Sequence, residues 1–180
     1  MATVVLLGTL DTKGHEFQFL RTQLLAEGCD TVLVDAGIMG TPLVTPDVSA
    51  DEVALAAGAE RGALAAAGDR GAAVAAMGYG AAQVLQRLYA EGRLHAVLGM
   101  GGSGGSSLFS RAVSRLPVGT PKILVSTVAS GNTRAYVGTS DLTLTDAVVD
   151  IAGINVISEK ALGIAAAAAA GMARHAAGRR

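Results

Sequence analysis

A glycine- and serine-rich loop follows a short apolar run in the middle of the chain, in the order Val97-Leu98-Gly99-Met100-Gly101-Gly102-Ser103-Gly104-Gly105-Ser106-Ser107. A segment compatible with a helix begins directly after it. Backbone N–H groups that converge at the start of a helix, where the dipole is positive, bind phosphate or carboxylate. We therefore expect an anion to bind at Gly101, Gly102, Ser103, Gly104, Gly105 and Ser106. The competing interpretation is a tight turn that only lets a helix pack closely on a strand.

The spacing of the glycines limits the kind of anion site. Gly99, Gly101 and Gly104 satisfy G-x-G-x-x-G, but glycine makes up 24 of the 180 residues, so chance matches are common. A dinucleotide site has an acidic residue about twenty positions further on, and residues 121–127 contain no carboxylate. The sequence G-K-[ST] is missing as well, which excludes a Walker-type P-loop.

Short apolar runs without polar alternation are typical of strands that helices cover on both faces. Four runs have this form: Val4–Leu7, Thr31–Val34, Ala96–Leu98 and Ile123–Ser126. Helical patterns lie between them, and a short further strand is expected at Leu142–Leu144. The alternation predicts an α/β fold with a doubly wound, mostly parallel sheet and helices on both faces, a Rossmann-like three-layer sandwich. No linker interrupts the chain, so residues 1–180 are expected to form a single domain.

Polar or small residues follow each predicted strand, and parallel strands present their carboxyl ends at one edge of the sheet. These candidates are Thr9, Asp11, Thr12 and Lys13 after the first strand, Asp35 and Gly37 after the second, and Ser126, Ser130, Gly131 and Asn132 after the fourth. Lys13 would give a point charge to a phosphate, with Thr9 and Thr12 as hydroxyl donors. Asp11 or Asp35 would bind a ribose hydroxyl or hold magnesium through water. Ser103, Ser106 and Ser126 would complete the phosphate site. In the alternative interpretation, Asp11 and Thr12 only cap a helix.

Other chemistry receives little support from the sequence. His15 beside Glu16 is a candidate general base, but it has no placed partner. No spacing of His, Asp or Glu resembles a set of metal ligands, so no metal site is expected. Asp146 and Asp150, four residues apart, are predicted to share one face of a helix. Cys29 is the single cysteine and is expected to be a packed thiol.

Composition excludes some partners. The net charge is −1 and no basic stripe is present, so nucleic acid is not expected as a ligand. The apolar N-terminus lacks a basic segment and is predicted to be a strand, which favours a cytoplasmic protein. The alanine-rich segment 163–177 is predicted to be a helix, too short and too weakly apolar for a membrane span. We expect that helix to dock on another domain or subunit outside this chain.

Five segments in this order resemble one known family: Gly8-Thr9-Leu10-Asp11-Thr12-Lys13-Gly14, Val34-Asp35-Ala36-Gly37, Gly99-Met100-Gly101-Gly102-Ser103-Gly104-Gly105, Val125-Ser126-Thr127-Val128-Ala129-Ser130-Gly131 and Val137-Gly138-Thr139-Ser140-Asp141. They are similar to the ATP-binding-domain family named after the tomato mosaic virus resistance protein. The resemblance implies an ATP-binding module, and in the plant member an inhibitor that binds a viral replication protein. It also implies homo-oligomers and a second α/β half, so this chain would be the first half of a longer protein.

The leading expectation is therefore an ATP-binding domain, with or without Mg²⁺, for which hydrolysis of ATP is not implied. One alternative is an α/β metabolic enzyme that acts on a small phosphorylated or carboxylated substrate, with His15 and Glu16 or Asp35 transferring protons. Another is an interaction module whose nucleotide stabilises a conformation that binds a protein partner.

Overall fold

The protein folds around a five-stranded parallel sheet, as the computed structural model, which describes residues 1–179, shows. The strand order is β2-β1-β3-β4-β5, and each neighbouring pair is parallel. The strands are β1 (Thr3–Gly8), β2 (Asp30–Asp35), β3 (Ala96–Gly101), β4 (Lys122–Ser126) and β5 (Leu142–Asp146). The predicted α/β class is confirmed, and the fifth strand forms where the sequence indicated it.

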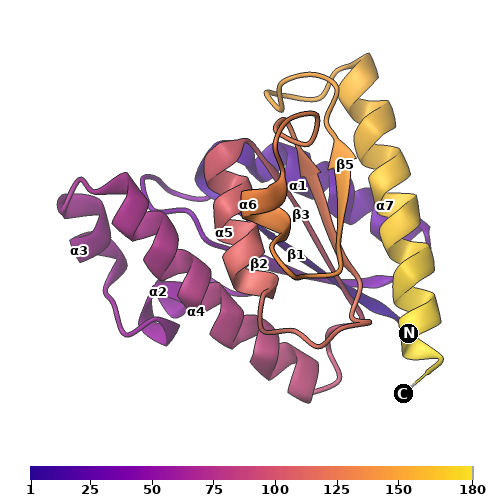
Figure 1. Cartoon of the computed structure of the whole chain (residues 1–180), viewed down its shortest axis with the longest axis horizontal. Helices are drawn as coiled ribbons and strands as arrows, with labels where there is room; N and C mark the ends of the chain where they lie inside the picture. Colours follow the sequence, from indigo (N-terminus) through magenta and orange to yellow (C-terminus); the bar gives the residue numbers. More distant parts are fainter. Residues whose placement is uncertain (180) are drawn as a thin grey trace.

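Helices cover both faces of this sheet (Figure 1). On one face lie α1 (Leu10–Ala26) and α7 (Val156–Ala177), and on the other α2 (Ala50–Ala56), α4 (Arg70–Ala90) and α5 (Ser103–Val113). Two short helices, α3 (Arg61–Ala66) and α6 (Arg134–Val137), lie further out. A capping box starts α2, because the side chains of Ser49 and Glu52 each accept the other's backbone N–H.

The strand order reverses between β1 and β3. The chain leaves β1 through α1 on one face to reach β2, then returns over β1 through α2, α3 and α4 on the other face to reach β3. In open α/β sheets, a crevice for ligands forms at the carboxyl ends of the strands where the order reverses. The residues that follow β1 and β3 are therefore the ones best placed to line a site.

Two strand glycines make room for the buried phenylalanines of the core. A Cβ on Gly8 would lie 2.1 Å from the ring of Phe17, and a Cβ on Gly99 would lie 2.2 Å from the ring of Phe109. Each ring thus packs directly on a strand backbone, one on each face of the sheet. Gly99, the first glycine of the G-x-G-x-x-G spacing, therefore serves packing.

The alanine-rich C-terminal helix corrects two expectations. It docks on this chain's own sheet, since Leu162, Ala165, Ala166, Ala169, Ala170 and Ala173 are all buried. Within residues 1–179, α7 is the one helix long and apolar enough to cross a membrane by length and composition alone, so the expectation that it is too short was wrong. Small side chains suffice here because they let the helix axis approach the sheet closely.

Candidate functional site

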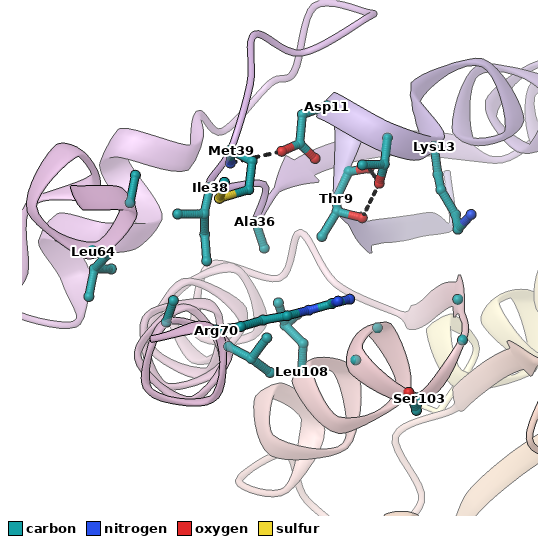
Figure 2. Close-up of a pocket in the computed structure, with 18 of the residues that line it drawn as sticks. Thr9, Asp11, Lys13, Ala36, Ile38, Met39, Leu64, Arg70, Ser103 and Leu108 are labelled. Atoms are coloured by element: carbon teal, nitrogen blue, oxygen red, sulfur yellow. Dashed lines mark hydrogen bonds between the residues drawn. The ribbon is translucent and has the colours of Figure 1, made fainter. Parts of the chain in front are cut away.

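A cavity of about 660 Å³ opens at the carboxyl ends of β1 and β3. Its walls are the first turns of α1, α4 and α5, the loop after β2, and α3 (Figure 2). Among the predicted site residues, those that line it are Thr9, Asp11, Thr12, Lys13, Gly101, Gly102, Ser103, Gly104 and Gly105. The structure thus brings together the loops after the first and third strands, as the parallel sheet predicted.

The glycine loop forms the start of α5. Gly102 is the N-cap residue and supplies no side-chain cap, while the first N–H groups of a helix have no intrahelical acceptor. The N–H groups of Ser103, Gly104 and Gly105 are therefore available to an anion in the cavity. Gly101 lets the loop pack closely on the start of α5, because a Cβ there would lie 3.0 Å from the Cα of Gly105.

Arg70 is a basic residue of this cavity that the sequence did not indicate. It is the first residue of α4, is exposed, and extends across the cavity toward the glycine loop (Figure 2). A Cβ on Gly104 would lie 3.4 Å from its Nη2. Among the described residues, the guanidinium has no hydrogen-bond or ion-pair partner. An unpaired guanidinium beside free N–H groups favours a phosphate or carboxylate.

The loop after β1 adds polar groups at the same end of the cavity. The hydroxyls of Thr9 and Thr12 share a hydrogen bond of 2.9 Å. Lys13 lies in a non-helical turn of α1 and donates through Nζ to the carbonyl oxygen of Ile151. This contact ties α1 to the loop after β5. The expected helix face shared by Asp146 and Asp150 does not exist, since Asp146 ends β5 and Asp150 lines the cavity from that loop.

The two aspartates proposed for ribose or magnesium occupy different environments. Asp35 is 2% exposed, and its Oδ1 accepts from the N–H groups of Leu10 at 3.0 Å and Gly37 at 2.8 Å. Burial raises the pKa of Asp35 above its ordinary value, although these two hydrogen bonds oppose the rise. Asp11 lines the cavity, and its Oδ2 accepts from the N–H groups of Met39 and Gly40. Asp35 and Gly37 thus support the loops without lining the cavity.

The remaining predicted residues lie away from the cavity. Ser106 and Ser126 are fully buried, and their hydroxyls share a hydrogen bond of 2.6 Å that ties α5 to β4. Ser130, Gly131 and Asn132 form an exposed turn after β4, where the Asn132 side chain accepts from the N–H of Arg134. His15 is exposed and Glu16 is buried, with its Oε1 bound to the N–H of Gly153. None of these seven residues lines the cavity.

The opposite end of the cavity is apolar. Its lining there comes from the loop after β2, from α3 and from α4 and α5, and consists of Ala36, Ile38, Met39, Leu64, Ala65, Ala73, Val74 and Leu108. One end of the cavity therefore offers backbone N–H groups and the cations Lys13 and Arg70, and the other end is apolar; the carboxylates of Asp11, Asp69 and Asp150 also line the cavity. That division suits a ligand with an anionic group at one end and a flat apolar group at the other.

Comparisons with known proteins identify relatives. The N-terminal-domain model of the uncharacterised protein family UPF0261 matches residues 2–178. A UPF0261 protein of Clostridium tetani is 43% identical over 171 residues, which are 95% of this chain and 42% of that relative. A UPF0261 protein of Rhizobium meliloti is 41% identical over 173 residues, which are 96% of this chain and 42% of that relative.

A plant protein is similar over a shorter stretch. The ToMV resistance protein Tm-1(GCR237) of Solanum lycopersicum is 57% identical over 82 residues, which are 46% of this chain and 11% of that protein. The resemblance expected from the five motifs is confirmed for the N-terminal part of the family. The chain spans less than half the length of the bacterial relatives that it matches.

Proposed function

The chain belongs to the uncharacterised protein family UPF0261, and we propose that it binds ATP, with the phosphates at the start of α5. The observation that carries the proposal is the set of unpaired donors around Gly104. The N–H groups of Ser103, Gly104 and Gly105 face the same cavity as the guanidinium of Arg70. Donors held in this way by a helix start and a nearby guanidinium are typical of phosphate sites.

The rest of the cavity supports a nucleotide over a small anion. Its volume of about 660 Å³ lies in the ordinary range for sites that hold a cofactor-sized ligand. A base would contact the apolar end around Ile38 and Leu64, and the phosphates would lie at the Gly101–Gly105 end. Inorganic phosphate alone would leave the apolar end empty.

The enzyme alternative receives less support. Proton transfer requires a group within hydrogen-bond reach of the substrate. His15 and Glu16 do not line the cavity, and neither does Asp35. Among residues 1–179, no cluster of His, Cys, Asp and Glu could hold a metal ion on its own. Any Mg²⁺ would therefore arrive with the phosphates.

The test is calorimetric titration of ATP into the wild-type chain and into Gly104→Asp, each with Mg²⁺ and with EDTA. A Cβ at 104 would meet no backbone atom outside α5 within 4 Å, and the nearest side-chain atom is Nη2 of Arg70 at 3.4 Å. The new carboxylate would occupy the phosphate position and pair with Arg70. We expect the affinity for ATP to fall at least about tenfold, since a like charge replaces an attraction at the helix start.

The matched control is Gly171→Asp, which places the same side chain on α7 with no neighbour within 4 Å. It is expected to leave ATP binding unchanged. Equal affinities for wild type and Gly104→Asp would refute the phosphate position. No binding of ATP by the folded wild-type chain would refute the proposal for this chain.

A further inference from the structure

We propose that Asp11 recognises a ribose hydroxyl of the bound nucleotide. This inference rests on the proposed nucleotide site and adds the residue that would hydrogen-bond the ribose. It starts from one carboxylate oxygen whose hydrogen bonding the protein leaves incomplete.

Asp11 is held firmly by one oxygen only. Its Oδ2 accepts from the N–H of Met39 at 3.0 Å and from the N–H of Gly40 at 3.2 Å. Its Oδ1 is buried and has no partner, and it is the one such side-chain atom among the described residues. A buried acceptor without a donor is costly, and more so when it is charged. A donor from outside the chain would remove that cost.

The position of Asp11 indicates which donor this is. Figure 2 shows Asp11 between Met39 on one side and Thr9 and Lys13 on the other, above the guanidinium of Arg70. It thus lies between the apolar end and the phosphate end of the cavity. A carboxylate repels phosphate, but it is a strong acceptor for a hydroxyl. In a nucleotide, the ribose joins the base to the phosphates and carries those hydroxyls.

The geometry favours Asp11 over Asp35 for this role. In dinucleotide-binding folds the ribose is read by a carboxylate near the end of the second strand, which is the position of Asp35 in this sheet. Oδ1 of Asp35 already accepts two backbone N–H groups, and the residue does not line the cavity. Asp11, which follows the first strand, keeps one oxygen unused.

Gly37 lies directly beside Oδ1 of Asp11. A Cβ on Gly37 would lie 2.6 Å from Oδ1, so glycine at this position preserves the space around the carboxylate. Asp11 itself lines the cavity, so a ligand hydroxyl beside its carboxylate would supply the donor that Oδ1 lacks. Met39, which lines the cavity beside Asp11, is 82% exposed.

The experiment compares ATP, 2′-deoxy-ATP and 3′-deoxy-ATP by calorimetry, in EDTA and in Mg²⁺, on wild type and Asp11→Asn. Asparagine keeps an oxygen for the N–H groups of Met39 and Gly40 but puts an amide donor in place of the free acceptor. In wild type, at least one deoxy analogue is expected to bind about ten- to a hundredfold more weakly than ATP, as a hydrogen bond to a charged acceptor is lost. In Asp11→Asn this gap is expected to close to within about threefold.

Two further variants guard against indirect effects. Asp69→Asn makes the same charge change in the same cavity and keeps an N-cap side chain for α4. Its difference in affinity between ATP and the deoxy analogues is therefore expected to match that of wild type. Gly37→Ala keeps the aspartate in the sequence, but the added methyl group displaces its carboxylate. The difference in affinity between ATP and the deoxy analogues is therefore expected to close in this variant. Gly37→Ala keeps the inference testable even where Asp11→Asn fails to fold.

The outcomes separate this inference from the proposed function. No deoxy penalty in wild type, or an unchanged penalty in both Asp11→Asn and Gly37→Ala, overturns the role of Asp11 while ATP binding stands. Equal weakening of all three nucleotides in Asp11→Asn, seen only with Mg²⁺, also overturns it, because Asp11 then binds the hydrated cation. A wild-type chain that binds none of the nucleotides rejects the proposed function itself.

Discussion

At the scale of single residues, an ion pair between a buried lysine and an aspartate at the surface fixes one of the motifs that the sequence singled out. Lys122 on β4 is 1% exposed, and its Nζ donates to the carbonyl oxygens of Pro117 and Thr120 and, at 2.6 Å, to Oδ1 of Asp141. Asp141 also accepts from the N–H of Gly119. This aspartate therefore holds the start of β5 against β4 and lies outside the cavity at the carboxyl ends of β1 and β3.

Asp141→Asn is expected to lower the free energy of unfolding by about 1–3 kcal/mol at pH 7, since the buried ammonium loses its counter-ion. Burial raises the pKa of Asp141, but the hydrogen bonds from Lys122 and Gly119 lower it by more, to below its ordinary value of 3.8. The carboxylate therefore stabilises the fold above pH 3.8, and this contribution disappears as the pH falls through the lower pKa of the folded state. Urea unfolding from pH 2 to 7 measures it.

Asp51→Asn is the control, because its ion pair with Arg61 is exposed and such pairs contribute about 0–1 kcal/mol. Wild type and Asp141→Asn are expected to differ most near neutral pH and to converge in acid. A difference that stays constant down to pH 2 would show that the charge of Asp141 is irrelevant.

The residues of the cavity show what local sequence can predict. Thr9, Asp11 and Lys13 were found because they directly follow a strand whose apolar pattern is unmistakable. Arg70 was missed because it starts a helix far from any strand, and nothing in its neighbours' types indicates that this helix start reaches the glycine loop. Ser106 was expected in the phosphate site, but its place in α5 turns it toward Ser126 and the core.

At the scale of elements, the packing of α4 on α2 depends on a glycine. The glycines in the middle of α4 would weaken an isolated helix, yet the helix is continuous from Arg70 to Ala90. A Cβ on Gly80 would lie 1.8 Å from the carbonyl oxygen of Val53. The glycine therefore lets the two helices approach closely, and the close contact compensates for its low helix propensity.

Gly80→Ala is expected to destabilise the protein by about 2–3 kcal/mol, because the added methyl group meets rigid backbone. Gly171→Ala, on α7 with no neighbour within 4 Å, is expected to stabilise it by about 0.5–1 kcal/mol through helix propensity alone. Urea unfolding of both variants gives the comparison. The same sign for both would contradict the packing argument.

The element that sequence reasoning misjudged is α7. Its alanines form a weak apolar stripe, and sequence alone does not reveal how near a helix comes to the sheet. In the structure, five alanines and Leu162 fill the face of the sheet beside α1. How closely a helix packs on the sheet depends on the space that the neighbouring helices and strands leave for it, and that space is set by the whole fold.

At the scale of the whole molecule, the two cores share the same strands. Val4 and Leu6 point into the core under α1 and α7, while Val5 and Leu7 point into the core under α2, α4 and α5. Because alternate residues of one strand serve both faces, neither core can come apart without disturbing the other. The alternation of apolar strands and helices was enough to predict this architecture, although the strand order required the structure.

Unfolding in urea is therefore expected to be a single cooperative transition. Far-UV circular dichroism, which reports helices on both faces, and the fluorescence of Tyr79, Tyr89 and Tyr136 are expected to give one midpoint. On the proposed function, ATP at a hundred times its dissociation constant adds about 2.7 kcal/mol to the free energy of unfolding. Two separate midpoints would show that the faces unfold independently.

The uncapped start of α5 has a practical consequence for all of these experiments. Its free N–H groups and the unpaired Arg70 attract oxyanions by charge and hydrogen bonding, whatever molecule carries them. Sulfate and inorganic phosphate in a buffer would then compete with a nucleotide and make its binding look weaker in proportion to their concentration. On the proposed function, the choice of buffer salt therefore sets the fraction of the anion site that is occupied before any nucleotide is added.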